Sequence, residues 1–518
     1  MTPPANSTDA SAARWTLVSA VLGSSMAFMD GTVVNVALPA IQRSMNASGA
    51  DAQWLIEAYA LFLAALLLVG GALGDRFGRK RVFLIGVVVF TAMSAACAAA
   101  QDTGQLIAAR ALQGIGAALL VPGSLALLGA NFPEDRRGRA IGTWSAFSGI
   151  TAAIGPVVGG FLVDHFSWRW AFLLNLPIGA ALLFACLAKV PESRGEAADG
   201  PIDLAGAVTA TLGLAGIVFA LIEAPTRGWS SAPVAIAGAV GLAGLVAFIA
   251  CEARVRNPMM PLRLFADRDF AGANLLTLLL YAALGGGLYF VPLNLIQVQG
   301  YAATAAGASL LPFVAIMFAL SRWAGSLVDR MGAKIPLVAG PSIAALGFAL
   351  LARPGVGGNY WTTFFPAMCV LGLGMTITIS PLTTTVMNAL GEKLAGTASG
   401  VNNAVSRAAG LLAIAALGAV LAHVFEPRLR DALAQARLPA GVADAVVAQH
   451  AKLGAIAPPA GAASAVAAQV RDAVGSAFVA GFRAVMLCSA GLALASALSA
   501  WWLISGRRPE SSSKGSAP

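Results

Sequence analysis

Long apolar runs alternate with short polar connections along almost the whole chain. Fourteen of these runs are long enough to cross a hydrocarbon layer of about 30 Å as helices. They lie at 15–41, 52–74, 82–100, 104–130, 139–163, 169–188, 202–223, 232–251, 269–298, 303–328, 335–352, 361–388, 395–424 and 477–504. The pattern predicts an all-α polytopic membrane protein with 14 transmembrane helices.

Composition supports this prediction. Hydrophobic residues make up 58% of the chain, charged residues make up 11%, and the mean hydropathy is +0.78. That is too little polar surface to cover a water-soluble globule of this length. The five cysteines fall inside apolar runs and lack the paired spacing of a disulfide framework or a metal site, so we interpret them as small core residues; they are Cys97, Cys186, Cys251, Cys369 and Cys488.

The net charge of +9 follows the connections between the helices. With the amino terminus inside, the short outer loops hold only Arg43, Arg169, Arg227 and Arg353, and most remaining lysines and arginines lie in cytoplasmic segments. An excess of basic residues in cytoplasmic loops sets the orientation of a membrane protein. Both termini are therefore predicted to be cytoplasmic, and nucleic-acid binding is not needed to explain the charge.

A polar segment between two apolar runs, from Gly70 to Arg81, recurs later in the chain. Five of its positions are repeated at one constant offset: Gly71, Asp75, Arg76, Gly78 and Lys80 match Gly325, Asp329, Arg330, Gly332 and Lys334. The first copy follows the second helix and the second copy follows the tenth. The duplicated unit is therefore six helices, with two helices inserted between the repeats, in a 6+2+6 arrangement.

This arrangement predicts the following organisation. A disordered cytoplasmic amino terminus precedes an amino-terminal six-helix bundle, two inserted helices, a carboxy-terminal bundle with one long outer loop, and a cytoplasmic tail. The ranges are 1–14, 15–188, 202–251, 269–504 with its loop at 425–476, and 505–518.

The repeated segment resembles the loop after the second helix in transporters of the major facilitator superfamily. The fourteen helices resemble the drug:proton antiporter branch of that superfamily, and three further motifs support the likeness. They are Met29–Ile41 with Asp30, Thr32, Asn35 and Pro39; Arg110–Gly116; and Gly155-Pro156 followed by Gly159-Gly160. The resemblance implies proton transfer at the second motif and antiport at the third. It also implies gating at Gly71, Asp75, Arg76, Gly78, Arg79, Lys80, Asp329 and Arg330.

Three deep polar residues are the candidates for proton coupling. An acid in a membrane helix needs a partner, a solvated cavity or a proton, so Asp30 suggests a proton site; the alternative is an aspartate permanently bonded to Thr32 or Asn35. Glu57 and Arg110 are both expected about 8–9 Å below the outer boundary and can meet there. Their contact is either a fixed salt bridge or a proton relay toward Asp30.

Polar residues in several helices are candidates for lining a substrate cavity. Amides near the aromatic side chains of Tyr281, Tyr289 and Phe290 suit flat amphipathic ligands, although aromatic packing between helices explains the same pattern. The predicted cavity residues are Asn35, Gln113, Asn294, Gln297, Asn402 and Arg407. Gln113 is also placed one turn from Arg110, as a neutral hydrogen-bond partner.

The long outer connection from Phe425 to Ser476 is rich in alanine and carries charges of both signs. Its spaced leucines and valines predict short amphipathic helices on the outer surface. Either a cap over the last two helices or an element that docks a partner fits this pattern.

Motifs for other functions are missing from the sequence. It contains no phosphate-binding loop, no zinc-protease motif and no nucleophile elbow, and its three histidines are scattered. No enzyme activity, cofactor or metal is therefore expected. The prediction is a proton-coupled exporter of amphipathic organic compounds or drugs across the bacterial inner membrane, with substrate, protons and the lipid bilayer as partners and no periplasmic adaptor specified. The alternatives are a dedicated exporter of one endogenous metabolite and a transport-inactive sensor or scaffold.

Overall fold

The computed structural model describes the chain except residues 1–6, 195–202, 257, 391–393, 440 and 506–518. Within the described ranges the chain is helical and contains no strand. Fourteen of its helical segments are long and apolar enough to cross a membrane, which confirms the number predicted from the sequence. Their sequence fits the hydrocarbon because each contains an 18-residue window with at most two charged residues.

The first part of the chain forms six spans. Their helices are α1 (Ser7–Met45), α2 (Gly49–Phe77), α3 (Arg79–Ala99), α4 (Thr103–Asn131), α5 (Glu134–His165), and the pair α6 (Trp170–Leu173) and α7 (Asn175–Lys189). Residues 7–14 were expected to be disordered, but they continue α1 as helix. Alanine is the strongest helix former, and three alanines in this stretch favour that extension.

Two more helices, α8 (Leu204–Arg227) and α9 (Ala232–Arg254), follow. The later spans are built from η1 (Leu262–Ala266), α10 (Arg268–Leu293), η2 (Asn294–Val298), α11 (Ala303–Ala308), α12 (Leu311–Gly325), α13 (Leu327–Met331), α14 (Lys334–Leu351), α15 (Tyr360–Ala389), α16 (Ala395–Gln435), α17 (Val442–Val447), η4 (His450–Ala455) and α18 (Ser464–Leu503). The element η2 is a π-helical segment that continues directly from α10. The series is consistent with the 6+2+6 arrangement.

The chain forms two compact units, and each draws on separate stretches of sequence. Unit 1 comprises Met1–Met260, Leu288–Ala308 and Ile414–Gly481. Unit 2 comprises Pro261–Gly287, Ser309–Ala413 and Phe482–Pro518. The domain boundaries proposed from the sequence repeat stay a prediction.

Glycines allow the helices of unit 1 to pack closely. A Cβ atom at Gly86 would lie 2.9 Å from the backbone of α4, and one at Gly116 would lie 2.6 Å from the backbone of Phe90. Without a hydrophobic driving force between helices in lipid, such close backbone approach provides much of the packing energy. The apolar core beside this contact includes Met26, Phe83, Phe90, Leu120 and Leu182.

Close contacts at glycines also hold the helices of unit 2 together. A Cβ atom at Gly347 would lie 2.8 Å from the backbone nitrogen of Leu371, and one at Gly372 would lie 2.8 Å from the carbonyl oxygen of Phe313. These contacts join α14 and α12 to α15. A larger side chain at either position would force the helices apart.

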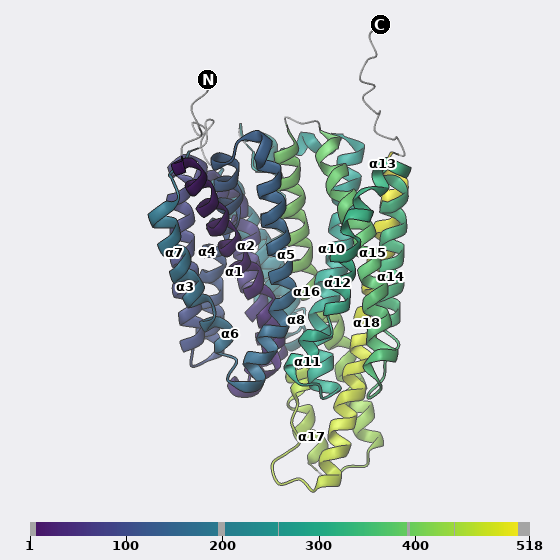
Figure 1. Cartoon of the computed structure of the whole chain (residues 1–518). Coiled ribbons are helices and arrows are strands. Elements are labelled where there is room, and N and C mark those ends of the chain that lie inside the picture. The colour runs from purple at the N-terminus through teal and green to yellow at the C-terminus, as the bar shows by residue number, and fades with distance from the viewer. Residues whose placement is uncertain (1–6, 195–202, 257, 391–393, 440, 506–518) are drawn as a thin grey trace, which may run out of the picture. The chain divides into compact units, whose positions relative to one another are not determined.

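The connection expected at 425–476 is more helical than its sequence suggested. Helix α16 runs through the expected boundary to Gln435, and α18 begins at Ser464. With 41 and 40 residues they are about 60 Å long, roughly twice the hydrocarbon thickness. Figure 1 shows their ends running beside each other toward α17. An ion pair one turn apart, between Glu426 and Arg430, supports the extension of α16 beyond the apolar run.

Candidate functional site

Asp30, on α1, lies at the centre of a buried polar cluster. Its Oδ2 atom accepts a hydrogen bond of 2.5 Å from Nη1 of Arg110 on α4, and both side chains are inaccessible to solvent. Its Oδ1 atom accepts from Nε2 of Gln113 at 3.0 Å and from Nδ2 of Asn175 at 2.9 Å. The carboxylate is therefore held by three donors, from α4 and α7. The alternative partners considered for it, Thr32 and Asn35, do not donate to it: Thr32 bonds instead to carbonyl groups of its own helix.

Hydrogen bonds from Nε and Nη1 and two aromatic rings hold Arg110 in place, and its buried Nη2 atom has no hydrogen-bond partner among the described residues. Its Nε atom donates to the carbonyl oxygen of Leu55 at 3.0 Å, and Nη1 also donates to Oε1 of Gln113 at 2.8 Å. Its guanidinium carbon lies 4.3 Å from the ring centre of Tyr59 and 5.8 Å from that of Phe172. A planar cation between aromatic rings gains cation–π attraction in addition to its ion pair. The expected hydrogen bond between Arg110 and Gln113 is thus confirmed.

Asn175 completes the cluster, and sequence reasoning missed it. Its amide also donates to Oγ of Ser94 at 2.9 Å, and that hydroxyl donates to the carbonyl oxygen of Phe172 at 2.8 Å. The available signal was an amide inside an apolar run, since polar side chains at membrane depth usually have a partner or a function. Asn175 adds a second donor to Oδ1 of Asp30, which also accepts from Gln113.

Glu57 does not meet Arg110, so the expected contact between them is wrong. Both carboxyl oxygens of Glu57 are buried and have no hydrogen-bond partner among the described residues. The prediction placed Glu57 and Arg110 at the same level, but it did not account for the face of α2 on which Glu57 lies. Leu55 and Tyr59, which contact Arg110, are each two positions from Glu57 in the sequence. Residues two apart on a helix point in nearly opposite directions.

Helix α5 packs against α1 through the glycines of its motif. A Cβ atom at Gly155 would collide with Oγ1 of Thr32, and one at Gly159 would lie 2.7 Å from the side chain of Val33. Pro156 lies inside the helix, where it removes one backbone hydrogen bond. The two glycines therefore form the small-residue face that their spacing predicted.

The first copy of the repeated polar segment forms the turn between α2 and α3. Gly78 has φ +108°, and its backbone N–H donates to the carbonyl oxygen of Gly74. Nε of Arg79 donates to Oδ1 of Asp75 at 2.7 Å. Both residues of this pair are partly exposed, so its contribution to stability is modest. The remaining gating residues of this copy, Gly71, Arg76 and Lys80, belong to the same turn or the helices beside it.

Glu192 holds this turn, and it was not predicted. Its carboxylate oxygens accept from the backbone N–H groups of Lys80 at 2.9 Å and Arg81 at 3.1 Å, at the start of α3. A carboxylate at a helix amino terminus is stabilised by the helix dipole. Glycine suits position 78 because its φ of +108° is one that residues with a side chain rarely adopt.

The second copy of the repeat has related backbone geometry. Gly332 has φ +77°, and its N–H donates to the carbonyl oxygen of Val328, as Gly78 donates to Gly74. Arg330 is exposed at the end of α13. The side chain of Asp329 lies outside the described residues. The positive φ at both matched glycines explains why the repeat retains glycine there.

The predicted cavity residues are divided between the two units. In unit 1, Oδ1 of Asn294 accepts from Gln299 at 3.2 Å, and Nε2 of Gln297 donates to Oε1 of Gln42 at 2.7 Å. Asn35 has a buried side-chain oxygen with no partner in the part of the chain that the structure describes. Gln113 belongs to the cluster around Asp30.

In unit 2, Nδ2 of Asn402 donates to Oγ1 of Thr277 at 2.7 Å and to Oδ1 of Asn274 at 3.2 Å. Arg407 is half-buried on the same helix, α16. Amides held in this way are oriented, so each presents a defined donor or acceptor. Their role in binding a substrate stays a prediction.

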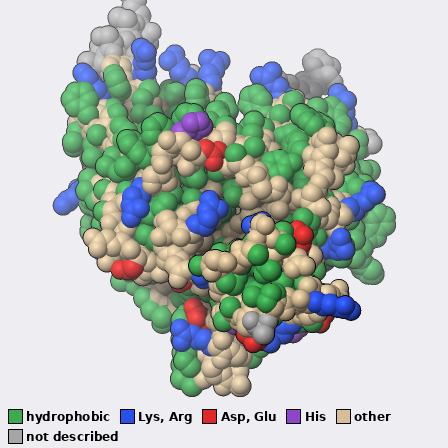
Figure 2. All heavy atoms as spheres, turned by 90° about the horizontal axis from the view of Figure 1, so that it is seen from below, with side chains coloured by type: hydrophobic (Ala, Val, Ile, Leu, Met, Phe, Trp, Pro, Cys, Tyr) green, Lys and Arg blue, Asp and Glu red, His purple; other side chains and the backbone are tan. Residues whose placement is uncertain are grey.

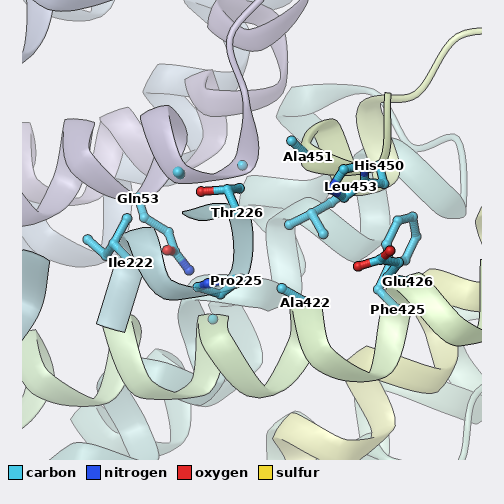
Figure 3. A pocket seen from close by; sticks show the side chains of 13 residues that line it. Gln53, Ile222, Pro225, Thr226, Ala422, Phe425, Glu426, His450, Ala451 and Leu453 are labelled. Atoms are coloured by element: carbon cyan, nitrogen blue, oxygen red, sulfur yellow. The ribbon is translucent and has the colours of Figure 1, made fainter. Parts of the chain in front are cut away.

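A pocket in unit 1 lies where the outer connection contacts α2 and α8. Figure 3 shows Gln53, Thr226, Glu426, His450 and Leu453 around it. Its cavity volume is only about 40 Å³. Water molecules fit in this space, but a drug-sized ligand does not. The pocket is therefore a gap beneath the outer connection and not the substrate site.

The face seen in Figure 2 carries Lys and Arg side chains with Asp and Glu side chains interspersed among them. Such a mixed surface does not favour one sign of ligand charge.

Comparisons with known proteins agree with this architecture. The chain matches the Major Facilitator Superfamily over residues 20–414. It is 37% identical over 423 residues to the multidrug resistance protein Stp of Mycobacterium tuberculosis, covering 81% of this chain and 78% of that protein. It is 32% identical over 489 residues to the tetracenomycin C resistance and export protein of Streptomyces glaucescens, covering 93% and 90%.

Among solved structures, the chain is similar to a bacterial homologue of the human lysosomal transporter Spinster, crystallised in an inward-facing and unoccupied conformation. The TM-score is 0.65 at 17% identity, with 94% of this chain and 96% of that chain covered. At this identity the likeness concerns the fold alone. The sequence match, the fourteen membrane helices and the shared fold together show that this multi-pass membrane protein belongs to the Major Facilitator Superfamily.

Proposed function

We propose that the protein is a proton-coupled exporter, an antiporter, of amphipathic organic compounds or drugs. It acts in the bacterial inner membrane with both termini in the cytoplasm. Relatives named for multidrug, tetracenomycin C and puromycin resistance support export of such compounds. The excess of basic residues in alternate connections supports the orientation.

One observation carries the proton-coupling proposal: two acids lie deep in the same unit in opposite settings. Asp30 is bound by an arginine and two amides. Glu57 is fully buried, and neither of its oxygens has a partner among the described residues. A carboxyl group without a donor is far less costly in an apolar interior when it holds a proton than when it is charged.

These settings suggest different roles for the two acids. Glu57 carries the exchanged proton, and the Asp30–Arg110 pair, with Gln113, holds α1 against α4. When a substrate reaches Glu57 from the cytoplasm, the proton of Glu57 passes to water on the cytoplasmic side and the carboxylate gains a polar partner in the substrate. The same group then serves proton and substrate in turn, which couples the two fluxes.

The packing of α5 supports a carrier over a sensor or scaffold. Gly155 and Gly159 bring α5 to backbone contact with α1 beside the Asp30 cluster. Close helix packing of this kind leaves little space between α5 and α1, and the resemblance to the antiporter branch implies that this motif limits leakage through the unloaded carrier.

Uptake into inside-out membrane vesicles tests the function. An acidic interior should drive accumulation of substrate, and a protonophore should abolish it. Cationic, anionic and neutral amphiphiles of similar size should be compared with vesicles lacking the protein. Equal accumulation of substrate with and without the pH gradient would contradict antiport.

The same panel separates a multidrug exporter from an exporter of one metabolite. The relative from Streptomyces glaucescens, whose match covers 93% of this chain, is named for a single compound. That name supports the alternative in which the protein exports one metabolite. Transport of several unrelated amphiphiles identifies the multidrug exporter. Transport of one compound class identifies the dedicated one, and substrate binding without transport identifies a sensor.

A further inference from the structure

Asp164, near the carboxy-terminal end of α5, binds a segment far away in the sequence. Its Oδ1 atom accepts from the backbone N–H of Ala303 at 3.0 Å. Its Oδ2 atom accepts from the backbone N–H of Thr304 at 2.8 Å and from the Thr304 hydroxyl at 2.7 Å. Three hydrogen bonds thus converge on one carboxylate and join α5 to α11, which lie side by side in unit 1 (Figure 1).

Backbone contacts accompany these hydrogen bonds. A Cβ atom at Gly160 would collide with the carbonyl group of Ala303, and one at Gly307 would collide with the carbonyl oxygen of Pro156. Pro156, Gly160 and Asp164 are spaced four apart, so they lie along one face of α5. That face is the contact surface for α11.

The α11 face differs from the face of α5 that contacts α1. Gly155 and Gly159 pack closely on Thr32 and Val33 of α1, and the side-chain hydrogen bond between these two helices lies farther toward the amino-terminal part of α5, from Nε1 of Trp144 to Oγ of Ser24 at 2.7 Å. The α1 contact joins two helices of the predicted first bundle. The α11 contact joins that bundle to a helix of the predicted second one, at the end of α5 that faces outward in the predicted orientation.

We propose that Asp164 is the outer latch of the transport cycle: it positions α11 against α5 while the outer exit is closed and releases α11 when the exit opens. This inference rests on the proposed function, because two bundles that rock about a central site must part on the outer side to release substrate. The α1 contact persists through this step, and the α11 contact does not.

The chemistry of the contact suits a bond that must break in every cycle. Asp164 is exposed, and the hydrogen bonds from Thr304 lie at the protein surface. Water can replace each donor as the contact opens, so the net cost per hydrogen bond is small. A buried ion pair such as Asp30–Arg110 would be much harder to break.

The first experiment measures exposure of the contact without any substrate. A single reporter cysteine replaces Ala303, which is 5% exposed, in a variant whose five native cysteines are changed to serine or alanine. A membrane-impermeant maleimide is added from the outer side. Asp164→Asn should raise the labelling rate at least about fivefold, as expected for losing about one net hydrogen bond.

The matched control is Asp102→Asn. Asp102 also accepts a backbone N–H at a helix start, from Gln105 at 2.8 Å, but this bond lies within α4 itself. The control should label at the parental rate. If Asp164→Asn also labels at the parental rate, Asp164 is not a latch. Because no transport is measured, this result does not depend on whether the protein is an antiporter.

The second experiment closes the latch covalently. Cysteines at positions 164 and 304 replace side chains that are in contact, so oxidation should join them. Transport in vesicles should then fall at least about tenfold and return on reduction, whereas single-cysteine variants should not respond. Failure to form the disulfide, or full transport with the disulfide formed, would overturn the proposal.

Discussion

At the scale of single residues, two buried acids of unit 1 have opposite surroundings. Asp30 is surrounded by donors from α4 and α7, and Glu57 has none among the described residues. Breaking a buried ion pair leaves an uncompensated charge, which costs about 3–5 kcal/mol. In the proposed neutral state of Glu57, replacing its carboxyl group by an amide of the same shape leaves no new charge. Substitutions of the two acids should therefore have different effects.

Asp30→Asn should lower the free energy of unfolding by about 3–5 kcal/mol, because Arg110 loses its counter-charge. Glu57→Gln should change it by less than about 1 kcal/mol. Thermal unfolding of the purified protein in detergent compares the two variants directly. Equal destabilisation by both would contradict the different settings described for them.

The Glu57→Gln variant also locates the proton. Substrate added to purified protein in weak buffer should release protons, and Glu57→Gln should abolish that release while the protein stays folded. Substrate binding, measured separately, controls for loss of the site. Undiminished proton release from Glu57→Gln would return the proton site to Asp30.

The sequence identified the deep polar residues of this region, but it did not identify which of them contact one another. Asp30, Glu57 and Arg110 stood out because charge at membrane depth is costly. The depth of each residue in the membrane followed from the rise per residue. Which residues pair depends on how each helix is rotated about its own axis, and a run that is apolar on every side does not specify that rotation. Asn175 and Glu192 were missed because each acts through contacts with residues distant in the sequence.

At the scale of helices, the closeness of α5 and α1 depends on the absence of a side chain. Gly155→Leu should leave the protein inserted but impair exchange, since a Cβ atom alone would already collide with Thr32. Overpacking of this kind costs about 1–3 kcal/mol. Gly149→Leu is the matched control on the same helix, because a Cβ atom there would meet nothing within 4 Å.

Exchange in the two leucine variants should be compared after their amounts in the membrane have been equalised. Normal exchange by Gly155→Leu would show that close packing at this point is not part of the mechanism. Loss of exchange in both variants would point to a general effect of leucine on α5 instead.

The turn between α2 and α3 leads to a prediction about rate. Asp75→Asn removes the charge that binds Arg79, so it should lower the turnover number more than it weakens substrate binding. Glu426→Gln is the control, because Glu426 also pairs with an arginine four residues later on an exposed helix. A normal turnover number for Asp75→Asn would exclude the pair from gating.

The pattern of hydrophobicity predicts the helices inside the membrane, but it does not predict where the longest of them end. The fourteen spans were predictable because each must be apolar over about 20 residues. The ends of α16 and α18 were not, because a helix beyond the bilayer needs only an apolar stripe, which here includes the buried Leu429, Leu433 and Val470, and not a continuous apolar run. The connection, for which short helices were expected, therefore contains the short helix α17 together with the ends of two long helices.

At the scale of the whole molecule, the long outer connection allows a test of orientation. Arg437 is exposed, lies just beyond the end of α16 and precedes Leu438, so trypsin should cleave after it. Trypsin added to spheroplasts should produce two fragments that separate near this position. Inside-out vesicles should be protected there, and Arg437→Gln should remove the cut. Cleavage only in inside-out vesicles would reverse the predicted topology.

The length of α16 and α18 also affects what other molecules can recognise. Helices α16 and α18, each about 60 Å long, extend past the predicted outer boundary of the bilayer and carry α17 with them, whereas η4 packs back toward the start of α2, where Nζ of Lys452 donates to Oδ1 of Asn46 at 2.7 Å. In the predicted orientation, this places a folded epitope in the periplasm, distant from the deep acids. An antibody fragment raised against residues 441–463 should therefore bind spheroplasts without permeabilisation. A fluorescent label on it would give a signal from the working transporter without altering the membrane helices.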